Sequence, residues 1–264
     1  MKQLLRTCLT ALTALLITTT AAAQQPLKNT AFIGGETLEY KLYYNWKFIW
    51  INAGTATMAT TEKTYQGKPA YRCSLTTRTS KKLDKYFCMR DTLLSYTTHD
   101  LVPLYYRKGA SEGSRYYVDE LLYHYNNGCT VTMKELTSHG EHLTRQKSSK
   151  NNIYDMLSIF MRARSFDATH WEKGHTIVFT IADGNGLTYS KLRFRGRSKI
   201  KAEDDKRYDC LELSYLEPDG KKDKEIVRFY VTDDKRHIPV RLDLFLNFGV
   251  AKAYLKSMKG VKDA

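Results

Sequence analysis

The stretch TLEYKLYY, residues 37–44, decides the fold, because apolar and polar side chains alternate along it. Leu38, Tyr40, Leu42 and Tyr44 fall on one side of an extended chain, and Thr37, Glu39, Lys41 and Tyr43 fall on the other. A period of two is typical of a strand with one buried face and one face in water. The stretch therefore predicts a half-buried β-strand.

The same pattern continues along the chain in segments that are separated by turn sequences such as Gln66-Gly67-Lys68-Pro69 and Asn126-Asn127-Gly128. Further strands are predicted at 53–58, 70–79, 86–96, 104–108, 115–125, 130–136, 176–182, 187–199, 208–215, 225–232, 239–248 and 250–258. Sequential hairpins predict a mainly β protein, an antiparallel meander that curls into an open barrel or two packed sheets. No Pro-, Ser- or Gly-rich linker divides residues 24–264, so we expect a single domain.

One segment near the middle breaks the alternation. Between residues 152 and 164, apolar side chains recur at helical spacing: Ile153, Met156, Leu157, Phe160 and Met161. Asn151 or Asn152 can cap the start. We expect one amphipathic α-helix whose apolar face lies on a sheet, and the alternative is that its Met and Phe side chains line a ligand cavity.

The N-terminus has the features of a secretory signal. Lys2 and Arg6 precede an apolar run from 9 to 17, and Ala21-Ala22-Ala23 supplies the small residues that signal peptidase accepts. The apolar run is far below the roughly 20 residues of a membrane span. Residues 1–23 are therefore predicted to be a cleaved signal peptide, and the remainder to be an exported, soluble protein of the periplasm or outer-membrane surface.

Basic side chains exceed acidic ones by 42 to 28, which gives a net charge of +14. With 42% hydrophobic and 27% charged residues, the composition excludes a disordered or multi-spanning membrane protein. Because export disfavours nucleic acid as a partner, we expect envelope lipid, envelope polysaccharide or another envelope protein, with no transmembrane segment in the mature chain.

Four cysteines follow the signal: Cys73, Cys88, Cys129 and Cys210. Cys73 and Cys88 lie symmetrically about Ser80-Lys81, where a tight turn would bring them together as a disulfide. The alternative is four small buried apolar side chains. No CxxC or Cys-His spacing is present, so no zinc site or other metal site is expected.

A row of basic residues is the most unusual local feature: Lys191, Arg193, Arg195, Arg197 and Lys199. On a regular strand all five would project from one face and could capture phosphates, sulfates or carboxylates. The alternative is a solvated face balanced by acids such as Asp209 or Glu212 on the next strand. Gly196 can also mark a bulge that breaks the alternation.

Tyrosines cluster on neighbouring predicted strands, with Tyr106 and Tyr117 as candidate ligand-binding residues. Such rings can form a sugar-binding platform or line an apolar cavity. The alternative is structural, because cross-strand aromatic pairs stabilise a sheet by about 0.2–1 kcal/mol each.

Two patterns resemble catalytic motifs. Gly109-Ala110-Ser111-Glu112-Gly113 matches the nucleophile elbow, but strands are predicted on both sides of it, where the elbow needs a strand and then a helix. Asp233-Asp234 has the composition of a tight turn. We therefore predict no catalytic residues and no cofactor.

Several segments together resemble a known family. They are Gly35–Tyr40, Asn52–Ala56, Tyr154–Ser158, Val231–Arg241 and Phe248–Ala253. In this order they are similar to the exported bacterial proteins of the domain-of-unknown-function family 3108. The resemblance implies an all-β, YmcC-like architecture of curved antiparallel sheets, a place at the periplasm or outer membrane, and a link to envelope or surface-polysaccharide export. It carries no catalytic residues over to this chain.

We therefore expect a non-enzymatic envelope protein that binds or scaffolds an apolar, glycan or anionic ligand. Two alternatives stay open. One is an envelope hydrolase of glycan or peptide that uses Asp233, Asp234 or Ser111, and the other is a structural assembly partner with an apolar patch or an unpaired edge strand.

Overall fold

The computed structural model describes residues 26–46, 49–184, 186–247 and 249–263, so the predicted signal peptide lies outside the described residues. The described residues form one 15-stranded sheet, one α-helix and a short 3-10 helix. The first half consists of β1 (Thr37–Trp46), β2 (Ile49–Tyr65), β3 (Lys68–Thr79), η1 (Leu83–Lys85), β4 (Met89–Thr97), β5 (Pro103–Glu112), β6 (Arg115–Tyr125), β7 (Cys129–Leu136) and β8 (His142–Ser149). The second consists of β9 (Ile153–Tyr154), α2 (Met156–Ala163), β10 (Thr176–Asp183), β11 (Gly186–Lys201), β12 (Arg207–Asp219), β13 (Lys222–Thr232), β14 (Pro239–Leu246) and β15 (Gly249–Lys259).

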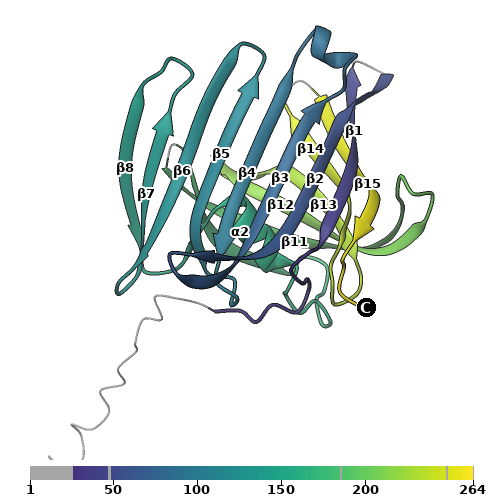
Figure 1. Cartoon of the computed structure of the whole chain (residues 1–264). Helices are drawn as coiled ribbons and strands as arrows, with labels where there is room; N and C mark the ends of the chain where they lie inside the picture. Colours follow the sequence, from purple (N-terminus) through teal and green to yellow (C-terminus); the bar gives the residue numbers. More distant parts are fainter. Residues whose placement is uncertain (1–25, 47–48, 185, 248, 264) are drawn as a thin grey trace, which may run out of the picture.

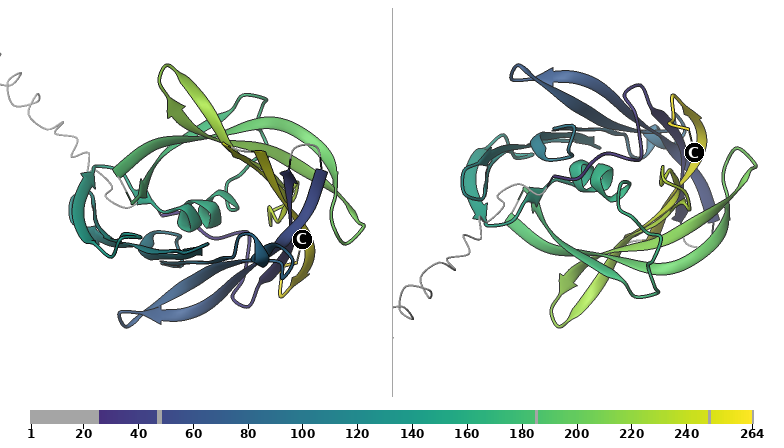
Figure 2. Two further views of the ribbon diagram at one scale, coloured as in Figure 1. Left: turned by 90° about the horizontal axis from the view of Figure 1, so that it is seen from above. Right: turned by 90° about the horizontal axis from the view of Figure 1, so that it is seen from below.

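The sheet is a meander in which the last strand, β15, pairs with the first strand, β1. Its order is β8-β7-β6-β5-β4-β3-β2-β1-β15-β14-β13-β12-β11-β10-β9, so β1 pairs with both β2 and β15. All neighbours are antiparallel except β9 and β10. Figure 1 shows the strands standing side by side as a curved wall, which Figure 2 shows from both ends as a ring. The predicted antiparallel meander is confirmed, and it forms a nearly closed barrel.

The two ends of the sheet, β8 and β9, approach each other at a seam. The Arg145 guanidinium of β8 donates to the Gly184 carbonyl in the β10–β11 turn at 3.1 Å, and Glu135 holds the same guanidinium at 2.9 Å. Side-chain contact thus bridges the seam where no backbone ladder joins β8 to β9.

Helix α2 lies inside the ring of strands (Figure 2). Leu157 and Met161 join the larger apolar cluster with β1–β7, and Ile159 joins a second cluster with β10–β13. The helix packs on the inner face of the sheet, as its sequence predicted, and the curvature of that sheet encloses the helix between both halves of the wall. Because Ile153 and Tyr154 form β9, the helix begins later than predicted.

The residue that caps α2 is Asp155, not Asn151 or Asn152. Its Oδ1 accepts the backbone N–H groups of Leu157 and Ser158 at 3.0 and 2.8 Å, and the Ser158 Oγ accepts the Asp155 N–H at 3.0 Å. Such a capping box satisfies backbone donors that the first helical turn leaves free. Asp155 Oδ2 also accepts from the Ser95 and Tyr123 hydroxyls, both at 3.2 Å, which attaches the helix to β4 and β6.

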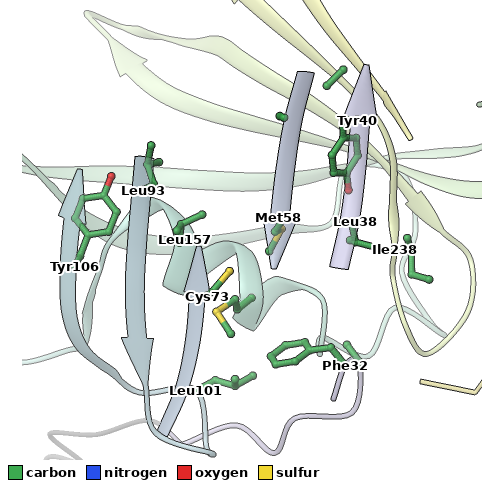
Figure 3. Close-up of a cluster of buried hydrophobic side chains, with 14 of the residues drawn as sticks. Phe32, Leu38, Tyr40, Met58, Cys73, Leu93, Leu101, Tyr106, Leu157 and Ile238 are labelled. Carbon is green, nitrogen blue, oxygen red and sulfur yellow. The ribbon is translucent and has the colours of Figure 1, made fainter. Parts of the chain in front are cut away.

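The inner face of the wall carries the core around the helix (Figure 3). Its large side chains include Phe32, Leu38, Tyr40, Met58, Leu93 and Ile238. A buried ion pair closes one side of this core, where both carboxylate oxygens of Glu36 accept from Arg164 at 2.5 and 3.0 Å. The helices of the described part of the chain are too short and too polar to cross a membrane.

The predicted disulfide between Cys73 and Cys88 is wrong in this structure, where both are free thiols. The β3–β4 connection is not a tight turn, because it contains η1 and spans residues 80–88. With this longer connection, the pairing of β3 with β4 places Cys73 opposite Ser95 of β4 and not opposite Cys88. Cys73, Cys129 and Cys210 are buried, which agrees with the alternative of small apolar side chains.

Candidate functional site

A groove of about 460 Å³ lies on the outer wall of the barrel, where the end of the β11–β12 hairpin meets β1, β2 and β15. We call it the wall groove, and its lining residues are Tyr43, Trp50, Lys201, Ala202, Glu203, Asp205, Lys252 and Tyr254. This volume falls within the roughly 300–1,000 Å³ that small-ligand sites occupy. The wall groove is therefore the candidate functional site.

Strand alternation explains why Tyr43 and Tyr254 reach the groove. Leu42 and Leu255 pack in the core, so their chain neighbours Tyr43 and Tyr254 point to the outside. The two outward rings meet edge to face, with centroids 5.9 Å apart. They give the groove a rigid aromatic floor.

The hairpin is held against the wall by backbone and side-chain bonds. β14 is paired with β15 up to Tyr254, and the next carbonyl, that of Leu255, accepts the Glu203 N–H at 2.9 Å. The Glu203 carboxylate in turn accepts from Lys41 Nζ at 2.5 Å and from the Tyr43 hydroxyl at 3.0 Å. Its hydrogen bond raises the pKa of Lys41 well above the usual range for a lysine. Glu203 thus serves to fix the hairpin.

Lys252 is the charged group of the groove that is not engaged by an acid. Its Nζ lies 4.4 Å from the centroid of the Trp50 ring, a cation–π contact. The other cations nearby are paired, Lys201 with Asp205 at 2.6 Å and Arg241 with Asp243 at 2.5 Å. Within the described residues, no ion pair involves Lys252. Partial burial, together with the positive charge of Arg241, lowers the pKa of Lys252.

This arrangement suits a ligand that carries an anionic group on a flat apolar face. An ammonium group above an indole gives the anion a partner, and the rings of Trp50 and Tyr254 offer C–H and π contacts. The carboxylates of Glu203 and Asp205 are not available to a cationic ligand in the same way, because each already forms an ion pair with a lysine.

The predicted basic row does not share one face. A bulge between Phe194 and Gly196 breaks the alternation of β11, as Gly196 suggested. Lys191 and Arg193 lie on the outer side, opposite the core residue Leu192, and Arg197 lies on the same side as Phe194, 5.3 Å from its ring.

Acids and a serine on neighbouring strands and turns engage this row. Lys191 and Arg193 both bind Asp223, at 2.8 and 2.9 Å, and Arg197 binds Asp233 at 2.8 Å. Lys199 pairs with Asp209 at 3.0 Å, and Arg195 donates to the Ser214 hydroxyl at 2.8 Å. Of the two acids predicted to balance the row, Asp209 does so, whereas Glu212 pairs with Arg228. A role of the row in ligand binding stays a prediction.

Tyr106 and Tyr117 point into the barrel, on the opposite side of the wall from Lys191 and Arg193. Tyr106 is buried beside Leu93 and Leu157 (Figure 3), and burial strongly raises its pKa. Tyr117 is half-buried and accepts from Lys108 Nζ while it donates to Glu112, both at 3.0 Å. The structure therefore does not bring the predicted tyrosines and the predicted basic row into one site.

The residues of the hydrolase alternative are also apart. Asp233 and Asp234 lie in the turn between β13 and β14, where Asp234 holds Arg236 at 2.6 Å. Ser111 lies on β5, paired with Tyr116 of β6 in a hairpin. Among the described residues, His, Cys, Asp and Glu side chains form no group of three that could hold a metal.

Sequence reasoning missed the wall groove because its residues come from three distant parts of the chain: β1 with the start of β2, residues 201–205, and β15. The signal available was the outward polar face of residues 37–44, where Lys41 and Tyr43 alternate with core positions. Nothing in the local pattern indicates that residues 201–205 fold back onto that face.

The comparisons with known proteins agree with this architecture. No curated protein matches the chain. Among solved structures, the crystal structure of a beta-barrel-like protein of the domain of unknown function DUF1849 from Brucella abortus is similar, with a TM-score of 0.58 at 10% identity, covering 88% of this chain and 100% of that one. At this identity the likeness concerns the fold alone. The model of the family described as protein of unknown function DUF3108 matches residues 39–256. The chain therefore belongs to the DUF3108 family.

Proposed function

We propose that this protein is a non-enzymatic, exported envelope protein that binds an acidic glycan in the wall groove. The observation that carries the proposal is the position of Lys252, whose ammonium lies above Trp50 inside the groove and has no ion pair among the described residues. A sugar ring stacks on aromatic side chains through its C–H face, and a carboxylate on that ring would neutralise Lys252.

The polar groups around the rings support a carbohydrate over a purely apolar ligand. Glu203, the Tyr43 hydroxyl and Lys201 border the aromatic floor, so a ligand with many hydroxyl groups finds donors and acceptors at the edge of the groove. A lipid chain would take these paired groups out of water and would offer them no hydrogen bond in return, which makes it the less favourable ligand.

The hydrolase alternative has less support. Glycoside hydrolysis uses two carboxyl groups on either side of the scissile bond, one of which must hold a proton at working pH. In the wall groove Lys201 lowers the pKa of Asp205, which keeps that carboxyl ionised, and Glu203 is held by Lys41 and Tyr43.

Isothermal titration calorimetry with a galacturonic-acid trisaccharide and neutral maltotriose tests the proposal. We expect the acidic sugar to bind more tightly, and the difference to shrink as salt rises. Lys252→Ala should weaken binding of the acidic sugar about tenfold and leave the neutral sugar unchanged, and Trp50→Ala should weaken both. A tenfold loss corresponds to about 1.4 kcal/mol.

Two control variants separate this site from the rest of the surface. Lys256→Ala removes an exposed lysine of the same strand that lies outside the groove, and the charge reversal Arg193→Glu/Arg195→Glu/Arg197→Glu alters the basic row. Both should bind like the wild type. Binding that survives Lys252→Ala but is lost in the charge reversal would move the site to β11, and failure to bind either sugar would refute the proposal.

A further inference from the structure

Exposed apolar side chains gather at one end of the barrel. They lie where β2 begins, between β3 and β4, where β6 begins and where β14 ends, and these parts of the chain share the upper end of the wall in Figure 1. We call this group the apolar rim: Ile49, Trp50, Tyr86, Phe87, Tyr116 and Leu246. Tyr86 is 88% exposed and Ile49 67% exposed, which is unusual for such large apolar side chains.

Backbone pairing shows that these strand ends lie at the same end of the barrel. Trp46 pairs with Ile49, Glu112 with Arg115 and Leu246 with Gly249 at the ends of three hairpins. Because β1 pairs antiparallel with both β2 and β15, the end of β1 and the starts of β2 and β15 lie at the same end of the barrel. The rim is therefore one feature of the fold, built from segments far apart in sequence.

Lysines stand among the rim side chains. Lys81, Lys82 and Lys85 are exposed in the β3–β4 connection directly before Tyr86 and Phe87. The acid of that connection, Asp84, is held by Arg90 at 2.6 Å. In the described part of the chain, none of the three lysines takes part in an ion pair. The rim thus combines exposed aromatic rings with uncompensated positive charge.

This combination fits one kind of partner. Aromatic side chains favour the headgroup region of a bilayer, and lysines near the surface are attracted to anionic lipids. A second copy of the chain fits less well, because a symmetric interface would place the same lysine cluster on both sides. From the rim geometry we propose that the barrel docks end-on, through the apolar rim, onto a membrane surface rich in anionic phospholipid.

Trp50 belongs to both the apolar rim and the wall groove, but the two proposals can be tested separately, because Tyr86, Phe87 and the three lysines do not line the wall groove. Sedimentation with large vesicles tests it, using palmitoyl-oleoyl phosphatidylglycerol mixed with phosphatidylcholine against phosphatidylcholine alone. We expect the full mature chain to bind the anionic vesicles at least tenfold more tightly, with the difference falling at high salt.

Two sets of variants separate the contribution of the aromatic side chains from that of the lysines. Tyr86→Asp/Phe87→Asp should reduce binding to anionic vesicles at least tenfold, and Lys81→Gln/Lys82→Gln/Lys85→Gln should remove the preference for anionic lipid. The matched control is Val178→Asp/Tyr189→Asp, which alters two side chains of similar exposure, 60% and 66%, on neighbouring strands of the side wall. All substituted positions are exposed, and thermal unfolding checks that each variant remains folded.

Three outcomes would overturn the proposal. The wild type could fail to sediment with anionic vesicles, the rim variants could bind like the wild type, or the side-wall control could lose binding to the same extent. A concentration-dependent dimer that the Tyr86→Asp/Phe87→Asp variant abolishes, without vesicle binding, would assign the rim to a second copy instead.

Discussion

Glu36 and Arg164 form a buried, two-pronged ion pair although 128 residues separate them. Both side chains are only 2% exposed. The Arg164 carbonyl also accepts a hydrogen bond from His237 Nδ1 at 2.8 Å, and burial lowers the pKa of His237, which keeps the ring neutral. One residue directly after α2 thus connects the segment before β1 with the turn before β14.

Removal of one partner of this pair should destabilise the barrel strongly. Glu36→Gln leaves the Arg164 charge buried without an acid, so we expect the free energy of unfolding to fall by about 3–5 kcal/mol. Urea unfolding measures it. The double variant Glu36→Met/Arg164→Met should recover most of the loss, and Lys199→Gln, which breaks an exposed pair, should have little effect. An unchanged midpoint in Glu36→Gln would contradict the role of the pair.

Asp155 should make stability depend on pH. Burial raises its pKa to about 6, from an ordinary value of 3.8. Between these values the folded chain holds a proton that the unfolded chain has released, so the free energy of unfolding should fall as the pH rises from about 4 to 6 and stay lower above it. The shift corresponds to about 3 kcal/mol at most.

Unfolding of Asp155→Asn at pH 4 and pH 7 tests this expectation. Asparagine keeps an oxygen that can cap the helix but does not titrate, so this variant should lose a large part of the slope. Asp91, whose pKa burial also raises to about 6, should contribute in the same direction. Asp209→Asn is the control at an exposed carboxylate, and a slope in Asp155→Asn equal to that of the wild type would refute the assignment.

Gly54 should tolerate no side chain. A Cβ at this position would lie 2.0 Å from the Arg78 carbonyl oxygen and 2.8 Å from the Thr79 Cα, and both are backbone atoms that cannot give way locally. We expect Gly54→Ala to lower the free energy of unfolding by about 3 kcal/mol or more. Gly186→Ala is the control, because a Cβ there meets nothing within 4 Å, and it should change stability by about 0.5 kcal/mol or less. Equal melting curves for the two variants would contradict this contrast.

The cysteines should differ in reactivity. Burial raises the pKa of the Cys73 and Cys210 thiols to about 12, which suppresses the thiolate that reacts. Cys88 is half-buried in the connection after η1. Maleimide labelling of the native protein, followed by peptide mass spectrometry, should modify Cys88 first and the others only after unfolding. Protection of Cys88 that a reducing agent removes would restore the predicted disulfide.

The sequence was most informative where one face of a strand is buried. The alternation in residues 37–44 predicted β1 and the orientation of Leu38 and Tyr40 toward the core, since burial of one face fixes the register. β8 was missed because His142–Ser149 is almost entirely polar and lies at an end of the sheet. Edge strands need no apolar alternation, and their charges discourage pairing with other chains.

Long-range geometry explains the other differences. The position of α2 inside the ring depends on barrel closure, which the period of the helix does not encode. The wall groove depends on the Glu203 N–H bond to Leu255, between a hairpin tip and a strand more than fifty residues later. The apolar rim is visible in the sequence only as scattered apolar residues in or beside turns, and it becomes a surface once the strands are ordered.

The pairing of β1 with β15 has a consequence for how the molecule is made. When the chain folds from its N-terminus onward, β1 keeps one backbone edge unpaired until β15 is available, because Thr37 pairs with Lys259. Contacts between segments so far apart in the sequence form slowly, and the unpaired backbone groups of a strand edge can pair with other unfolded chains. A chaperone that covers the unpaired edge of β1 would therefore raise the yield of native protein more than one that acts after β15 has paired.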